Sequence, residues 1–181
     1  MRKISLVQPK TAAQWLRIYC LYRSAFPRAE RKPFSIIVKM FRSGKTDLWC
    51  AENKGEFLGF AATINEDRLI LLDYFAVEKK HRGEGIGSAA LLAIREQYSG
   101  KGMFVEIEKE DPSAANREER QHRKQFYRDC GMDELNVTAR VFGVPMELLG
   151  WDCQLDFDRY RAFYRDNYSP RAAEHICPEE A

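Results

Sequence analysis

The chain has 181 residues, of which 45% are hydrophobic and 12% aromatic, a composition typical of one globular domain with a sizeable core. Lys and Arg number 29 against 27 Asp and Glu, a net charge of +2, which lacks the basic excess of most nucleic-acid-binding domains. No window approaches 18 consecutive apolar residues, and the N-terminal stretch has no signal-peptide core. We therefore expect a cytoplasmic protein that binds neither nucleic acid nor a membrane.

Sequence periodicity predicts helices followed by antiparallel strands in the first half of the chain. The predicted elements are a short strand at 4–7, helices at 11–26 and 35–41, and strands at 46–53, 56–65 and 69–77. In the first helix, Trp15, Ile18 and Tyr22 recur at helical spacing, and Pro27 ends the pattern. Lys54 and Gly55 favour a hairpin turn between the first two strands of this group.

The second half alternates between helices and strands. The predicted elements are a helix at 88–98, a strand at 103–110, a helix carrying into 125–131, strands at 135–144 and 145–151, and a helix at 156–168. The order strand, helix, strand between residues 69 and 110 implies a parallel crossover. The predicted fold class is therefore α/β, with a mixed, mostly antiparallel central sheet and flanking helices.

The end of the chain and the cysteines carry weaker signals. We expect one domain at residues 1–151 and a helical tail at 152–181 that packs on it, with a homodimer contact or a cover over the substrate as alternatives. The residues from Pro170 on are expected to be mobile. Five widely spaced cysteines fit reduced thiols rather than disulfides, and His175 with Cys177 does not complete a metal site, so we expect no metal.

The stretch 81-HRGEGIG-87 lies between the strand at 69–77 and the next helix. Its glycines permit backbone angles that a Cβ would block, and the helix start directs unpaired N–H groups at one spot. With the charge of Arg82 beside it, such a turn suits a pyrophosphate. The Walker pattern GxxxxGK[ST] does not occur, and 83-GEGIGS-88 does not match the Rossmann pattern GxGxxG.

This loop resembles the pyrophosphate loop of the GNAT N-acetyltransferase superfamily, whose members bind acetyl-CoA. The resemblance covers residues 3 to about 151 and rests on two motifs, 74-YFAVEKKHRGEGIGSAALL-92 and 126-FYRDCG-131. It implies the acyl-CoA N-acyltransferase fold with a splayed parallel strand pair. It also implies an enzyme that transfers an acetyl group from acetyl-CoA to a primary amine by direct attack in a ternary complex. A non-catalytic acyl-CoA-binding sensor or interaction protein with the same fold is the alternative.

The resemblance also implies which residues bind the co-substrate. The backbone of residues 75–77 would pair with the pantetheine arm, and the N–H groups of residues 82–87, with Ser88 close by, would hold the pyrophosphate. The implied cofactor-binding residues are Phe75, Ala76, Val77, Arg82, Gly83, Glu84, Gly85, Ile86, Gly87 and Ser88.

Acetyl transfer to an amine needs a base for the amine and benefits from an acid for the departing thiolate. Tyr127 matches the tyrosine of the family's FYxxxG motif and is the implied acid. Glu106, in the strand at 103–110, is the preferred base, with Glu108, Asp73 and an unassisted water route as alternatives. Strand alternation predicts that Glu106 and Glu108 share one face of the sheet.

One position departs from the family pattern. Many relatives have an asparagine seven residues before the tyrosine, where it contacts the cofactor; here that residue is Arg120, and Asn116 is the candidate replacement. The resemblance places the acceptor site at the first two helices, their connecting loop at 28–34 and the last strands. A peptide amine, a polyamine, an aminoglycoside and a small metabolite all remain open as acceptors.

Overall fold

The computed structural model describes residues 3–179. The strands of this part of the chain are β1 (Ser5–Val7), β2 (Thr46–Asn53), β3 (Glu56–Asn65), β4 (Leu69–Val77), β5 (Gly102–Glu108), β6 (Asp133–Val141), β7 (Val144–Trp151) and β8 (Ile176–Pro178). They are hydrogen-bonded in the order β1-β2-β3-β4-β5-β7-β6-β8, and β4 and β5 form the parallel pair of a mostly antiparallel sheet. The predicted fold class, a mixed α/β sheet with flanking helices, is confirmed.

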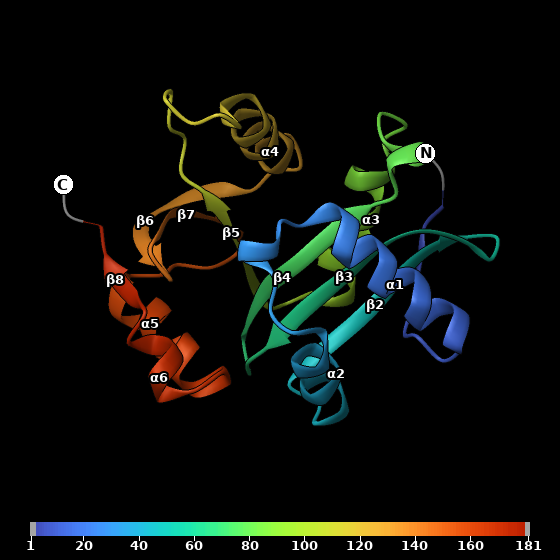
Figure 1. Ribbon diagram of the computed structural model, residues 1–181, viewed down its shortest axis with the longest axis horizontal. Coiled ribbons are helices and arrows are strands. Elements are labelled where there is room, and N and C mark those ends of the chain that lie inside the picture. Colours follow the sequence, from blue (N-terminus) through green and yellow to red (C-terminus); the bar gives the residue numbers. More distant parts are fainter. Residues whose placement is uncertain (1–2, 180–181) are drawn as a thin grey trace. The chain divides into compact units, whose positions relative to one another are not determined.

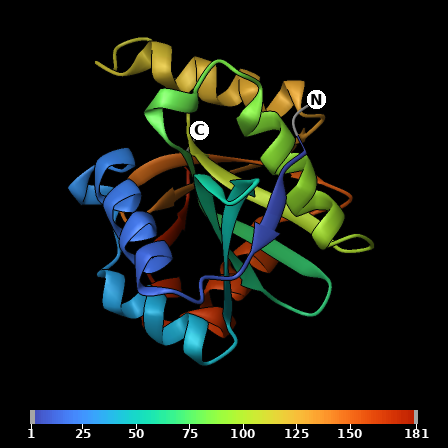
Figure 2. The same cartoon turned by 90° about the vertical axis from the view of Figure 1, so that its right-hand side faces the viewer.

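The chain folds into two compact units, the first of which contains residues 3–65 and 72–99. Its helices are α1 (Ala12–Ala25), α2 (Phe34–Arg42) and α3 (Ile86–Gln97), with single 3₁₀ turns at Arg28–Glu30 and Lys79–His81. Figures 1 and 2 show α1 and α2 on one face of β2 to β4 and α3 on the other. Because helices cover both faces, β3 is buried along nearly its whole length, which explains its continuous apolar sequence.

Local sequence signals account for the boundaries in this unit. Thr11 caps α1 through a capping box with Gln14, and the apolar face of α1 buries Ile18 and Tyr22. The hairpin between β2 and β3 turns at Lys54 and Gly55, both of which have positive φ. The three strands predicted at 46–53, 56–65 and 69–77 are confirmed with the same limits.

The second unit contains residues 66–71 and 100–179. Its helices are α4 (Arg117–Asp129), α5 (Phe157–Asn167) and the short α6 (Pro170–Ala173). In Figure 1, α4 lies on one side of the strands of this unit and α5 with α6 on the other. The parallel ladder joins Leu69–Leu71 of β4 to Gly102–Phe104 of β5, and β7 then pairs antiparallel with β5 and β6.

Two expectations for the C-terminal half were wrong. The residues after Pro170, expected to be mobile, form α6 and β8, and β8 pairs with β6 through Val141 and Ile176. The turn between the last two long strands lies at Phe142 and Gly143, with φ of 48° and 87°, rather than at Val144. Two successive positive φ angles close a hairpin in two residues, so β6 ends at Val141.

Two further features of the described residues bear on function. Among residues 3–179, no helix is both long enough and apolar enough to cross a bilayer. In the same part of the chain, no three His, Cys, Asp or Glu side chains are grouped so that they could hold a metal ion. All five cysteines are free thiols.

Candidate functional site

The glycine loop adopts the backbone that the sequence predicts. After β4, the chain makes one 3₁₀ turn and passes through Gly83 at φ +78° and Gly85 at φ +72°, and α3 begins at Ile86. A Cβ added at Gly83 or Gly85 would meet no atom within 4 Å. These two glycines are therefore required by their left-handed conformation and not by crowding, and the space beside them is open. Gly87 lies in the first turn of α3.

The N-terminus of α3 is suited to an anion. Its N-cap is Gly85, which has no side chain to accept from the helix, and the first turn contains no acidic residue. By contrast, Thr11 caps α1 and Asp156 caps α5 with side-chain oxygens. A helix start without such a cap retains unpaired N–H donors and about half a positive charge. Arg82 lies beside it, where its Nε donates to the carbonyl oxygen of Val77 at 3.3 Å.

The residues proposed for co-substrate binding all lie in the first unit. Residues 82–85 are exposed, Gly87 and Ser88 are half-buried, and Ile86 is buried against the core. The end of β4 is held tightly by β3: a Cβ on Gly59 would lie 2.4 Å from the carbonyl oxygen of Ala76. Glu78 also donates its N–H to the carbonyl oxygen of Leu58 at 2.8 Å. The backbone of residues 75–77 is thus placed by its neighbour in the sheet.

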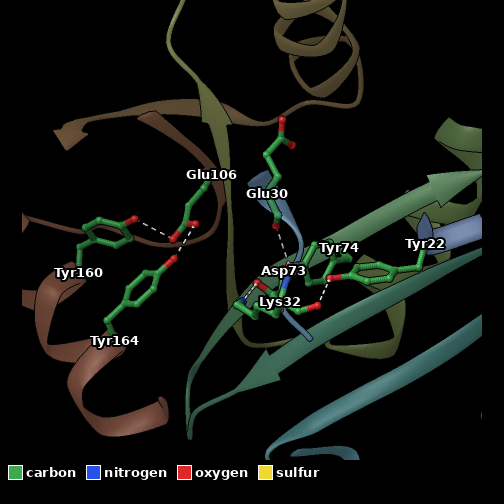
Figure 3. Close-up of polar contacts among 8 residues, drawn as sticks. All are labelled: Tyr22, Glu30, Lys32, Asp73, Tyr74, Glu106, Tyr160 and Tyr164. Atoms are coloured by element: carbon green, nitrogen blue, oxygen red, sulfur yellow. Dashed lines mark hydrogen bonds and ion pairs between the residues drawn. The ribbon is translucent and has the colours of Figure 1, made fainter. Parts of the chain in front are cut away.

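The loop between α1 and α2 is tied to β4 through backbone hydrogen bonds (Figure 3). The Tyr22 hydroxyl donates to the Lys32 carbonyl at 2.8 Å, and the Lys32 N–H donates to the Tyr74 hydroxyl oxygen at 3.2 Å. Tyr74 in turn donates to the carbonyl of Glu30 at 3.1 Å. Burial, followed by the nearby charge of Asp73, raises the pKa of Tyr74, which keeps its hydroxyl a donor. The loop expected to contact the acceptor therefore has a defined position.

Asp73 is held in an ion pair. Its Oδ1 lies 2.6 Å from Lys32 Nζ, and the side chain of Asp73 is only 9% exposed (Figure 3). The same ammonium lies 5.3 Å from the ring centroid of Tyr74. The Asp73 carboxylate is thus occupied by the lysine and largely shielded from solvent. This contact weakens the case for Asp73 as a base.

Glu106, on β5 in the second unit, accepts two hydrogen bonds from α5 (Figure 3). The Tyr160 hydroxyl donates to Oε1 at 2.7 Å, and the Tyr164 hydroxyl donates to Oε2 at 2.8 Å. Both distances are typical of strong O–H···O⁻ bonds. The carboxylate therefore receives one tyrosine donor on each oxygen.

Glu108, two residues along β5, has a different environment. Arg120 donates to its Oε1 at 2.9 Å, Asn116 donates to its Oε2 at 3.1 Å, and Arg123 Nη1 lies 3.6 Å from Oε2. Glu106 and Glu108 thus contact different helices, α5 and α4, although alternation predicts one shared face. Two guanidinium groups and one amide therefore occupy both oxygens of the Glu108 carboxylate. Arg120 and Asn116, the candidates for a cofactor contact, are both engaged in this network.

Tyr127 on α4 differs from the other buried tyrosines. Its side chain is 6% exposed, yet its hydroxyl makes no hydrogen bond within residues 3–179. The hydroxyls of five other buried tyrosines each make at least one: Tyr22, Tyr74, Tyr98, Tyr160 and Tyr164. Burial raises the pKa of Tyr127 to about 12, so its hydroxyl is a protonated donor at neutral pH. Within residues 3–179 the hydroxyl oxygen is not fully enclosed, so it can meet solvent or a ligand.

Tyr160 and Tyr164 were not among the site residues predicted from the sequence. The sequence predicts a helix at 156–168 within a tail that packs on the domain, and it assigns no role to these two hydroxyls. The available signal was chemical: the two residues carry hydroxyls four positions apart, so both project from one side of the helix. Their partner lies 54 and 58 residues earlier in the chain, a separation that no local pattern reveals.

The chain matches one protein-family model but no curated protein sequence. A family model described as an acetyltransferase (GNAT) domain matches residues 44–131. No curated protein sequence matches the chain.

Three solved structures illustrate the structural likeness. A putative GNAT-family acetyltransferase from Bacteroides thetaiotaomicron has a TM-score of 0.75 and 16% identity, covering 94% of this chain and 98% of that one. An aminoglycoside 6'-N-acetyltransferase complexed with coenzyme A has a TM-score of 0.67 and 16% identity, covering 84% and 99%. The ribosomal-protein-S18-alanine N-acetyltransferase from Escherichia coli has a TM-score of 0.59 and 15% identity, covering 84% and 96%. At these identities the likeness establishes the fold.

Proposed function

Because the chain carries an acetyltransferase domain of the GNAT family, we propose that it transfers an acetyl group from acetyl-CoA to a primary amine. The observation that carries this proposal is the loop at the start of α3, where two left-handed glycines precede a helix without a side-chain cap. The family uses acetyl-CoA, and one of the similar structures contains coenzyme A. The amine attacks the thioester directly, in a ternary complex.

Residues 82–88 fit the pyrophosphate of acetyl-CoA. Their exposed backbone leads into the helix start, the two left-handed glycines leave open space on their Cβ side, and Arg82 adds a full positive charge. These features satisfy a dianionic group through N–H donors, the helix dipole and one guanidinium. The backbone of residues 75–77 pairs with the amides of the pantetheine arm.

Glu106 is the proposed base. A free alkyl amine has a pKa of about 10.4 and must lose a proton before it can attack. The Glu106 carboxylate accepts that proton, directly or through a water molecule. The alternatives are less suitable, because Asp73 is paired with Lys32 and Glu108 with Arg120.

Tyr127 is the proposed acid. The amine nitrogen forms a bond to the carbonyl carbon, the C–S bond breaks, and its electron pair leaves on sulfur. The Tyr127 hydroxyl donates a proton to that sulfur, which completes the release of CoA. Its buried side chain, its hydroxyl without an acceptor in residues 3–179 and its pKa of about 12 support this role. The proton taken from the amine restores the neutral phenol through solvent after turnover.

Coenzyme binding provides the first test. Isothermal titration of the protein with acetyl-CoA is expected to give a micromolar Kd, about −8 kcal/mol. Gly85→Leu should weaken binding by at least about 100-fold, because a side chain at φ +72° strains the loop and occupies the space proposed for the pyrophosphate.

Gly55→Leu is the matched control. Gly55 has φ +82° and open space beside it, but it lies in the hairpin between β2 and β3. Its replacement should cost similar stability and leave the affinity for acetyl-CoA unchanged. Equal losses in the two variants would place the binding site elsewhere, and a wild-type protein that gives no heat of binding would overturn the proposed function.

A further inference from the structure

We propose that Tyr160 and Tyr164 are positioning residues that orient the Glu106 carboxylate, so that helix α5 forms part of the catalytic apparatus. This inference rests on the proposed function, in which Glu106 is the base. The two hydroxyls approach different oxygens of one carboxylate at 2.7 and 2.8 Å (Figure 3). Two donors on separate oxygens fix both the position and the rotation of the group, which one donor does not.

The helix is built to hold these hydroxyls in place. Residues four apart project from one side of a helix, which brings Tyr160 and Tyr164 to the same carboxylate. Asp156 fixes the start of α5, where its carboxylate accepts from the Arg159 N–H at 2.7 Å. A capped helix start reduces fraying in the turn that carries Tyr160.

Ring packing fixes the tyrosines further. Tyr160 is fully buried and Tyr164 is 3% exposed. Phe104, two residues before Glu106 on β5, packs edge-on against Tyr160 at 6.1 Å and against Phe163 at 5.2 Å between ring centroids. Because residues two apart on a strand share a face, the packing that holds α5 also sets its distance from Glu106.

The two hydroxyls also stabilise the negative charge of the Glu106 carboxylate. A partly buried carboxylate loses solvation, and donors to its oxygens compensate the ionised form. Burial, and after it the charge of Glu106, raises the pKa of Tyr160 well above its ordinary value, so this tyrosine remains a neutral donor. The tyrosines therefore act on Glu106 as donors and do not compete with it for the proton of the amine.

A packing role alone does not require the hydroxyls. Phenylalanine would provide the same ring volume against Phe104, as Phe163 already does from the next turn. The helix also lies beyond residues 44–131, the segment that the family model matches. The contact with Glu106 thus joins the segment that the family model matches to a helix outside it.

The test compares Tyr160→Phe, Tyr164→Phe and the double variant with the wild-type protein. Thiol release from acetyl-CoA is measured with spermidine, kanamycin and an alanine-initiated peptide, and the fastest of the three is used for kinetics. Each single variant should lower kcat by about tenfold, the value for losing one charge-assisted hydrogen bond, with the KM for acetyl-CoA unchanged. In a Glu106→Gln background, the same substitutions should cause no further loss.

A second readout does not depend on the acceptor. The Glu106 carboxyl is followed by ¹³C NMR in protein labelled at glutamate Cδ, with Glu106→Gln used to assign the signal. Its titration midpoint should move upward by about one pH unit for each hydroxyl removed, because each donor favours the ionised form. Hydroxyls that do not donate to this carboxylate would leave the midpoint in place.

Tyr98→Phe is the matched control. Tyr98 is also buried and donates to a carboxylate, that of Asp47, at 2.7 Å, but it lies in the first unit. Its replacement should leave kcat and the Glu106 titration unchanged. Unchanged kcat and midpoint in the Tyr160 and Tyr164 variants would overturn the inference. Full activity of Glu106→Gln would instead remove Glu106 from the proposed function.

Discussion

Replacing Glu106 with glutamine is expected to lower kcat by about 10²–10³-fold, within the range for removal of a general base. Glutamine has nearly the same shape and retains one oxygen for a tyrosine donor, but it cannot take a proton from the amine. The KM for acetyl-CoA should change little, because the coenzyme is proposed to bind through residues 75–77 and 82–88. Steady-state thiol-release kinetics with varied acetyl-CoA separate these two effects.

Glu108→Gln is the control for this prediction. Glu108 is a neighbouring strand carboxylate, but its partners are Arg120 and Asn116. Its replacement leaves the half-buried Arg120 guanidinium with a weaker partner and should lower the melting temperature with little change in kcat. The reverse pattern, with stability lost at Glu106 and turnover lost at Glu108, would exchange the roles of the two residues.

Tyr127→Phe is expected to lower kcat by about 10²-fold, the lower end of the range for a general acid, while the affinity for acetyl-CoA is retained. The substitution should cost almost no stability, because the hydroxyl makes no hydrogen bond within residues 3–179. Tyr98→Phe provides the contrast: its hydroxyl contacts Trp49, Thr63 and Asp47, so its loss should lower the melting temperature.

The pH dependence of Tyr127 has a definite sign. Its pKa is raised to about 12 by burial, above the ordinary value of about 10. The neutral, proton-donating form therefore persists until the pH approaches the raised value, and kcat should not fall between about pH 8 and 10 through ionisation of this residue. A basic limb near pH 10 that disappears in Tyr127→Phe would contradict the burial argument. An unchanged kcat in that variant would move the acid role elsewhere.

Much of the fold could be predicted because its signals are local. Local residue types determine where these strands begin and end. Lys54 and Gly55 form the hairpin turn, and an apolar strand lies on either side of it. The loop at residues 82–88 was predictable for the same reason, since left-handed glycines before a helix are a backbone property. The short strand β8 was missed because three residues carry no pattern, and its stability comes from pairing with β6, far away in the chain.

The candidate catalytic residues were only partly predictable. Tyr127 follows from a motif, but the lack of a hydrogen bond from its hydroxyl to any of residues 3–179 follows from packing. Alternation placed Glu106 and Glu108 together, yet what distinguishes them is which helix each one meets, α5 or α4. Tertiary structure brings those helices to the strand. No spacing in the sequence indicates that Glu106 meets two phenols and Glu108 two guanidinium groups.

The contact of α5 with β5 has a consequence for the order in which this protein matures during synthesis. The residues proposed to bind the coenzyme all precede residue 89 in the chain, and Glu106 follows soon after them. The phenols of Tyr160 and Tyr164, which are proposed to orient Glu106, come 54 and 58 residues after it. On our proposal, the residues that bind the coenzyme are therefore synthesised before those that orient Glu106. A chain that ends before α5 would contain the proposed coenzyme-binding residues and Glu106 but neither of the two phenols.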